Sequence, residues 1–209
     1  MQRGYYGRGR LVADDMATLG MILRTNGLPW MKEVYLNLNG FGDTGMQGLC
    51  DGLGRGAAPS LCTLSLSNNQ FGRAGAEALS AALHRGAMPK IEIMVLAHNP
   101  IGNQGVAALA APLRNKRPAL SQLIVGRCEI GDEGVASLVD NLGKDDFKAL
   151  KLLRLSNNNI TDAGVAKLLA ALDAGGLPKL VSQHYLLNNN PASAVAVESV
   201  NHALAKRSQ

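Results

Sequence analysis

Apolar residues recur along this chain in a pattern whose period changes halfway through each unit. The clearest unit is residues 61–83, LCTLSLSNNQFGRAGAEALSAAL. Its first half has the spacing LxxLxL of a short strand, and its second half has the spacing of one apolar helix face. The positions that define the unit are Leu61, Leu64, Leu66, Asn69, Phe71, Gly75, Ala76, Leu79 and Leu83. A strand and a helix of this size cannot bury both apolar sides without neighbouring copies.

The same unit occurs five times in succession, starting near residues 31, 61, 91, 120 and 150. Self-similarity at a fixed period defines a repeat architecture, because each unit buries its apolar side against the next one. Residues 14–30 hold the helix of a preceding half repeat, expected over about 14–24, and residues 180–206 hold an irregular last repeat. We therefore predict a single domain at 14–206, with a basic Gly/Arg/Tyr tail or degenerate cap at 1–13 and a tail at 207–209.

The register of the last repeat has two alternatives. A strict step of thirty from Asn158 leads to Asn188, whereas a shift of two leads to Asn190 and also aligns the apolar helix positions. We favour Asn190, which predicts a two-residue insertion around residues 180–184. The insertion would leave an exposed apolar edge at Val181, Tyr185 and Leu186.

The pattern LxxLxLxxN/C followed by a helix resembles the leucine-rich repeat, in the long, helix-containing form similar to ribonuclease inhibitor. The resemblance covers roughly residues 11–206 and implies an α/β fold. It implies a right-handed β–α solenoid, a curved horseshoe segment with a parallel sheet on the concave face and helices on the convex face. The motifs are specific for the fold and carry almost no information about a partner.

Two polar columns have structural interpretations. Asn or Cys follows each strand, where a buried amide can supply donors and an acceptor to turns that lack ladder partners. This column comprises Asn39, Asn69, Asn99, Cys128, Asn158 and Asn190, and we expect Cys128 to be a buried structural thiol. A second column is expected to cap the N-termini of its own helices; it comprises Asp43, Asn103, Asp132 and Asp162, with Arg73 interrupting it.

Composition and charge narrow the possible locations and partners of the protein further. There is no run of eighteen apolar residues and no apolar signal segment at the N-terminus, so neither a membrane span nor secretion is expected. Three cysteines without metal or disulfide spacing favour an intracellular, reducing location. The net charge of +5 arises in the tails, since 16 basic and 16 acidic residues remain without the five tail cations. These five are Arg3, Arg8, Arg10, Lys206 and Arg207.

A balanced body argues against nucleic-acid binding by the repeats. The sequence RGYYGRGR has two interpretations, a frayed tail or degenerate cap on the one hand and an arm that docks on RNA or an acidic protein on the other. Only the N-terminal cations Arg3, Arg8 and Arg10 would support the second.

The strand residues between the Leu positions should face the concave side. In the middle repeats these residues are apolar and are rimmed by basic side chains, which is typical of an interaction site. Branched residues also simply suit strands, which is the structural alternative. The predicted partner-binding residues are Tyr35, Ile93, Val95, His98, Ile124, Arg127, Leu152 and Arg154.

Catalytic chemistry finds little support. GLGRG at residues 52–56 follows a helix rather than a strand, which is the wrong context for a phosphate loop. The four histidines are scattered, and we expect no enzyme activity, cofactor or metal. The sequence predicts a non-catalytic protein–protein interaction scaffold or assembly subunit that binds through the concave face or through uncapped repeat ends.

The alternatives are a regulator of a small GTPase and the sensor repeats of a larger receptor. The Ran GTPase-activating protein resembles this repeat class, although its acidic C-terminal tract has no counterpart in the ending LAKRSQ. A full-length chain that begins within a repeat would favour an assembly subunit, and a longer parent protein would favour a sensor.

Overall fold

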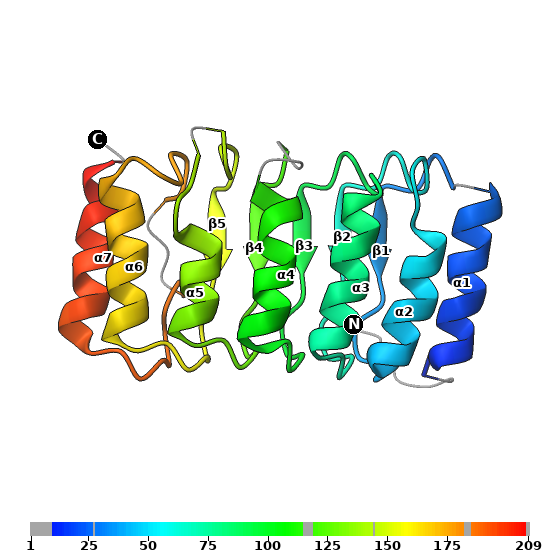
Figure 1. The fold of residues 1–209 in the computed structure, drawn as a ribbon, viewed down its shortest axis with the longest axis horizontal. Coiled ribbons are helices and arrows are strands. Elements are labelled where there is room, and N and C mark those ends of the chain that lie inside the picture. Colours follow the sequence, from blue (N-terminus) through cyan, green and yellow to red (C-terminus); the bar gives the residue numbers. More distant parts are fainter. Residues whose placement is uncertain (1–9, 27, 115–118, 144, 182–184, 208–209) are drawn as a thin grey trace, which may run out of the picture.

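Helices and strands alternate along the chain in the computed structural model, which describes residues 10–26, 28–114, 119–143, 145–181 and 185–207. The helices are α1 (Ala13–Asn26), α2 (Gly42–Gly52), α3 (Arg73–His84), α4 (Gly102–Arg114), α5 (Asp132–Val139), α6 (Asp162–Asp173) and α7 (Ala194–Lys206). The strands are β1 (Glu33–Tyr35), β2 (Thr63–Ser65), β3 (Ile93–Val95), β4 (Gln122–Ile124) and β5 (Leu152–Arg154). Figure 1 shows the helices side by side in chain order, in front of the strands.

The five strands form one parallel sheet in the order β1-β2-β3-β4-β5. Its register aligns the central residue of each strand with that of the next, from Val34 through Leu64, Met94 and Leu123 to Leu153. These central residues point toward the helices, and the residues on either side of them point away, because side chains alternate along a strand. The predicted α/β solenoid is confirmed. We call the sheet face that lies away from the described helices the concave face.

The core lies between the sheet and the helices and is formed by the repeating apolar positions. The glycine in the first turn of each helix from α2 to α6 is needed because an apolar side chain four residues earlier occupies the space of its Cβ. A Cβ on Gly75 would lie 2.8 Å from Phe71 Cβ, and one on Gly105 would lie 2.3 Å from Ile101 Cγ2. The pairing of Phe or Ile with Gly in the five full repeats is therefore a packing requirement.

The Asn column forms a hydrogen-bonded ladder that joins successive turns. Asn99 is fully buried; its Nδ2 donates to the carbonyls of Leu66 (2.9 Å) and Leu96 (2.8 Å), and its Oδ1 accepts from the N–H of Asn69 (2.8 Å). In the next repeat the Cys128 thiol donates to the Leu96 carbonyl at 3.4 Å. Each rung thus binds the backbone of its own repeat and of the preceding one.

Asn190, and not Asn188, lies at the sixth place in this ladder. Its Oδ1 accepts from the N–H groups of Asn158 and Ile160, both at 3.1 Å. Its Nδ2 donates to the carbonyl of Leu187 at 2.8 Å. The last repeat therefore continues the ladder although its residues contain no strand over the part that the structure describes.

The prediction that the acidic column caps its own helices is wrong. The residues concerned are Asp43, Asn103, Asp132 and Asp162, and each lies in the first turn of its helix and accepts hydrogen bonds from the next repeat. Asp43 Oδ1 accepts from the N–H groups of Gly72 (2.7 Å) and Gly75 (2.8 Å). Asp132 accepts from the N–H (2.8 Å) and the hydroxyl (2.6 Å) of Thr161. The column therefore caps helices between repeats and forms a second ladder.

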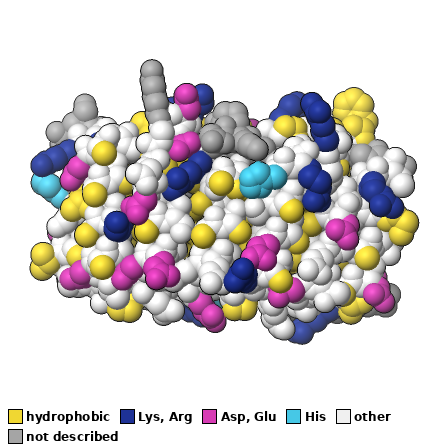
Figure 2. Space-filling model, in the orientation of Figure 1, with side chains coloured by type: hydrophobic (Ala, Val, Ile, Leu, Met, Phe, Trp, Pro, Cys, Tyr) yellow, Lys and Arg dark blue, Asp and Glu magenta, His cyan; other side chains and the backbone are white. Residues whose placement is uncertain are grey.

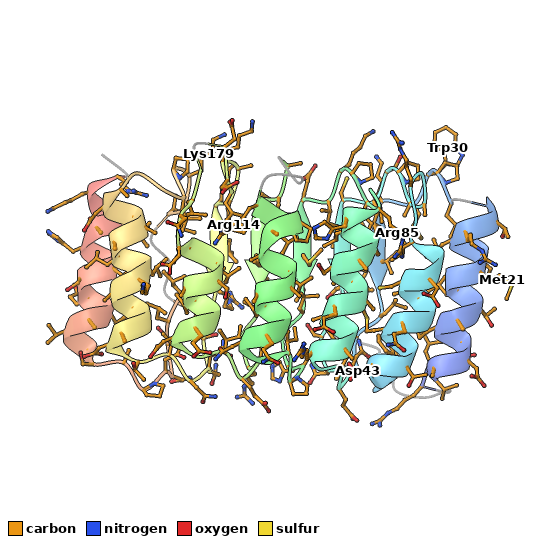
Figure 3. The ribbon with its side chains drawn as sticks, in the orientation of Figure 1. Met21, Trp30, Asp43, Arg85, Arg114 and Lys179 are labelled. Atoms are coloured by element: carbon orange, nitrogen blue, oxygen red, sulfur yellow. The ribbon has the colours of Figure 1, made fainter. Side chains whose placement is uncertain are left out.

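Arginines play the corresponding role at the other helix ends. Figure 3 shows Asp43 at the lower ends of the helices and Arg85 and Arg114 at the upper ends. Arg85 Nη2 donates to the carbonyl of Cys50 (2.6 Å) at the end of α2, and Arg114 Nε donates to that of Leu138 (3.2 Å) at the end of α5. Cations near helix C-termini also complement the macrodipole.

The edge of the last repeat differs in part from the prediction. Val181 and Tyr185 are exposed as expected, but Leu186 is only 2% exposed, so its assignment to the exposed edge is wrong. The carbonyl of Leu186 accepts from the N–H of Leu155 at 2.8 Å, which places it beside the concave-facing position of β5. Its side chain nevertheless turns inward and Tyr185 turns outward, so at residues 185–186 the sides are reversed relative to the aligned residues of β5.

Two predicted features lie outside the described residues. They are the N-terminal segment that contains RGYYGRG and most of the expected insertion.

Over the described ranges, no helix combines the length and apolar character needed to span a bilayer.

Candidate functional site

The concave face consists of columns of side chains that run across the strands. One column precedes the central strand residue and contains Glu33, Thr63, Ile93, Gln122 and Leu152. A second column follows it and contains Tyr35, Ser65, Val95, Ile124 and Arg154. Members of a column lie about 4.8 Å apart from strand to strand, so neighbouring side chains are in reach of one another.

Four half-buried aliphatic residues gather on β3 to β5. We call them the apolar strip: Ile93, Val95, Ile124 and Leu152. Val95 and Ile124 are direct neighbours in the register, and Ile93 lies on the same face of β3 as Val95. Gln122 separates Ile93 from Leu152 in the other column, so the strip is continuous only through Val95 and Ile124.

Three basic side chains border the apolar strip. We call them the basic rim: His98, Arg127 and Arg154. His98 (φ +60°) and Arg127 (φ +55°) are exposed and lie in the left-handed column that follows the strands. Arg154 is half-buried, and its Cζ lies 5.4 Å from the centroid of the Tyr185 ring. The Nε of Arg154 is buried and has no acceptor among the described residues.

Tyr35 is the one predicted site residue that the structure keeps apart from the others. It is 62% exposed at the N-terminal end of the sheet, and Ser65 lies between it and Val95 in the register. The Tyr35 hydroxyl donates to Glu33 Oε2 at 3.1 Å, and this hydrogen bond raises the pKa of Tyr35. Ser65 in turn donates to Asn37 Oδ1 at 2.7 Å, so the surface of β1 and β2 is polar.

Large exposed apolar side chains gather at the two ends of the solenoid rather than on its middle. Those of the described residues are Val12, Met21, Ile22, Trp30, Tyr35, Leu38, Val181, Tyr185 and Val195. Trp30 is 88% exposed, and Figure 3 shows it projecting from the upper edge beyond α2. The sequence analysis missed Trp30; the available signal was that Ser60, Lys90 and Lys179 occupy the equivalent place, so the fold does not need an aromatic residue there.

The described residues show no cluster of metal ligands, and two of their thiols are buried. No group of three or more His, Cys, Asp or Glu side chains among them could hold a metal ion. Burial raises the pKa of the Cys50 and Cys128 thiols to about 12, which disfavours the reactive thiolate. What the concave face presents instead is aliphatic area bordered by hydrogen-bond donors.

Comparisons with known proteins agree with this architecture. The sequence matches the family described as Leucine Rich repeat at residues 27–50, 57–80, 87–110, 119–139 and 149–169. No curated protein gives a significant match.

Among solved structures, the chain is similar to a tropomodulin C-terminal domain from Caenorhabditis elegans. The two are 14% identical, with a TM-score of 0.55 and coverage of 93% of each chain. It is also similar to a structure described as Leiomodin-1 Actin-Binding Site 2, at 14% identity and a TM-score of 0.53, covering 93% of this chain and 88% of the other. At such identity the likeness shows the fold alone.

Proposed function

The chain belongs to the leucine-rich repeat family, and on that premise we propose that it is a non-catalytic scaffold that binds one protein partner through its concave face. The observation that carries the proposal is the apolar strip together with the basic rim. Aliphatic residues bordered by polar groups on an otherwise soluble surface are typical of interaction sites. A partner that covers the strip would remove this area from water.

The contrast between the two faces of the solenoid supports this choice. Figure 2 shows the helix face, where acidic, basic and single hydrophobic side chains are interspersed. The outward residues of β1 and β2 are polar as well, and those of β2, Thr63 and Ser65, are buried. Only β3 to β5 offer adjacent aliphatic side chains on the sheet, so a partner on the concave face would be centred there.

Arg127 and Arg154 add to the suitability of this surface. Arginine is favoured where interfaces are strongest, because its planar guanidinium both packs and donates several hydrogen bonds. The ends of the solenoid, with Trp30 at one and Val195 at the other, provide secondary apolar surface for packing inside an assembly.

Charge insertion into the apolar strip tests the proposal. Val95→Arg and Ile124→Arg each place a cation where the partner would pack, whereas Ala107→Arg adds the same charge on the exposed side of α4 as a control. All three variants should keep the circular dichroism and unfolding midpoint of the wild type. A partner captured from the native source should be retained by the wild type and by Ala107→Arg and lost with both strip variants. Unchanged retention by both strip variants contradicts the proposal.

Actin is a defined first probe, because one of the similar structures is described as an actin-binding site. Co-sedimentation with actin filaments, using the same variants, asks whether that partner uses this face. If the captured protein is instead a small GTPase whose hydrolysis rate the chain stimulates, a regulator replaces the scaffold as the function.

A further inference from the structure

The charge on the concave face is mainly positive over the repeats that carry the apolar strip. In the two strand columns and the column of His98 and Arg127, the charged or titratable side chains of β3 to β5 are basic: His98, Arg127 and Arg154. The turn after β4 also carries an exposed acidic side chain, Glu129, two residues beyond Arg127. The one acidic residue of these columns is Glu33, which lies on β1 and accepts a hydrogen bond from Tyr35. The body as a whole is balanced, whereas Arg127, Arg154 and His98 outnumber the acidic Glu129 around the apolar strip.

Arg127 occupies a backbone position that does not favour it. Its φ of +55° lies in the left-handed region, where a long side chain is strained and Asn is preferred. The equivalent residues Asn68, Asn157 and Asn189 have φ between +56° and +59°. The fold therefore accepts Asn at this place and gains nothing evident from Arg. A binding role for its exposed guanidinium, at the border of the apolar strip, would account for Arg at this position.

Arg154 is held in place before any partner binds. Its guanidinium lies over the ring of Tyr185, and its buried Nε has no acceptor among the described residues. A buried donor without an acceptor is costly unless a bound group or a small shift satisfies it. A side chain fixed by packing loses little conformational freedom on binding, so it suits recognition of an anionic group.

Building on the proposed function, we propose that the partner presents an acidic segment to this face. Its aliphatic side chains seat on the apolar strip, and its Asp or Glu carboxylates pair with the basic rim. Arg127 and Arg154 lie on neighbouring repeats and in different columns, both on the C-terminal side of the strip, so each can pair with a carboxylate of the same segment.

The chemistry of the surface selects against other anions. Single-stranded nucleic acid is bound on aromatic platforms lined by tracks of cations, whereas the apolar strip is aliphatic and Tyr185 already lies against Arg154. Phosphorylated segments are recognised by clusters of arginines that converge on one phosphate. Two arginines in different columns beside aliphatic area fit a segment that carries several carboxylates better.

Selection from random peptides tests the inference directly. A phage-displayed library of random peptides is panned on the wild-type chain after depletion on the double variant Val95→Arg, Ile124→Arg, which leaves peptides that need the apolar strip. These peptides should be rich in Asp or Glu beside aliphatic residues. Synthetic, fluorescently labelled copies should bind about tenfold more weakly to Arg127→Glu and to Arg154→Glu. Binding to Arg24→Glu, the same charge change on the exposed last turn of α1, should stay within about twofold of the wild type, because that residue lies far from the concave face.

Charge exchange separates direct pairing from an effect on folding. When the critical acidic residue of a selected peptide is replaced by Lys, Arg127→Glu should recover most of the lost affinity, since the pair has merely been reversed. Raising the salt concentration from about 0.05 M to about 0.3 M should weaken the wild-type complex. It should weaken the complex of Arg127→Glu with the Lys-substituted peptide to a similar extent.

The outcomes distinguish this inference from the proposed function. Strip-dependent peptides that lack acidic residues, or that bind Arg127→Glu and Arg154→Glu as well as the wild type, overturn the acidic partner and leave the binding face intact. If replacing the critical acidic residue of a peptide by phosphoserine raises its affinity more than tenfold, the group that this face recognises is a phosphate rather than a carboxylate. A library that yields no strip-dependent peptide counts against both the acidic partner and binding through the concave face.

Discussion

Replacing Asn99 by Ala should destabilise the solenoid more than any comparable change on its surface. The side chain is fully buried and makes three hydrogen bonds of 2.8–2.9 Å, with the carbonyls of Leu66 and Leu96 and with the N–H of Asn69. Alanine leaves the buried Asn69 N–H without its partner, whereas the Leu66 carbonyl keeps Asn69 Nδ2 (2.8 Å) and the Leu96 carbonyl keeps the Cys128 thiol (3.4 Å). At about 1–3 kcal/mol for the unsatisfied N–H and about 0.5–1.5 kcal/mol for each of the two other lost hydrogen bonds, the expected loss is about 2–6 kcal/mol. That is a large fraction of the stability of a typical domain.

Urea unfolding followed by circular dichroism measures this loss, with Asn201→Ala as the matched control. Asn201 lies in α7, and its side chain makes no hydrogen bond with another described residue, so its removal should change the free energy of unfolding by less than about 0.5 kcal/mol. Asn99→Cys, which copies the chemistry of Cys128 in the next repeat, should fall between the two because a thiol donates only weakly. A loss below about 1 kcal/mol for Asn99→Ala would refute the ladder as a main source of stability.

Three further predictions concern the packing, the titration and the thiols. Gly105→Ala should destabilise by about 1–3 kcal/mol because its Cβ would overlap a neighbouring side chain, whereas Gly54→Ala, with open space around it, should be nearly neutral in the same urea experiment. Burial raises the pKa of Asp132, but the hydrogen bonds from the next repeat outweigh it and lower the pKa overall. The Asp132 carboxylate therefore stabilises the fold at neutral pH, and this contribution is lost as the pH falls below about 4. In Asp132→Asn, the free energy of unfolding should therefore fall less steeply as the solution is acidified. In the native protein at pH 8, iodoacetamide should label Cys62 and spare Cys128, and urea should make both reactive; native labelling of Cys128 at the same rate as Cys62 would contradict its burial.

The repeat positions could be read from the sequence because the same physical demand recurs every turn of the solenoid. Each strand must bury its central residue, each turn must satisfy its backbone groups, and each helix must accommodate the Phe or Ile beside its Gly. These demands fix residue type at a constant spacing, and spacing is what a single sequence displays. The strand register, the Asn ladder and the location of the apolar strip follow from them.

The acidic column was misassigned because spacing alone does not say which N–H groups a side chain faces. Asp43 stands at the start of a helix, where a cap of its own helix and a cap of the neighbouring helix require the same residue type. The packing of adjacent helix ends decides between them, and it brings Gly72 and Gly75 within 2.8 Å of Asp43 Oδ1. Contacts between repeats of this kind depend on geometry that only the assembled solenoid provides.

The candidate site was predicted in outline and corrected in detail. The columns of the concave face followed from the repeat alignment, which already places Gln122 between Ile93 and Leu152 and Tyr35 two repeats before Val95. The alignment did not show how far each of these side chains is buried. The contact between Arg154 and Tyr185 could not be predicted, because an irregular last repeat turns Leu186 inward and brings Tyr185 to the open side. The repeat pattern holds no template for such a reversal, because the five full repeats all keep the regular alternation.

Hydrogen exchange of the chain with and without its captured partner tests the binding face most directly. The proposed function predicts that new protection is concentrated in the backbone of β3, β4 and β5 and in the turns that carry His98 and Arg127, while the exposed sides of α3 and α4 exchange as before. Protection confined to α1 or α7, with β3 to β5 unchanged, would contradict binding through the concave face and would move the site to the ends of the solenoid.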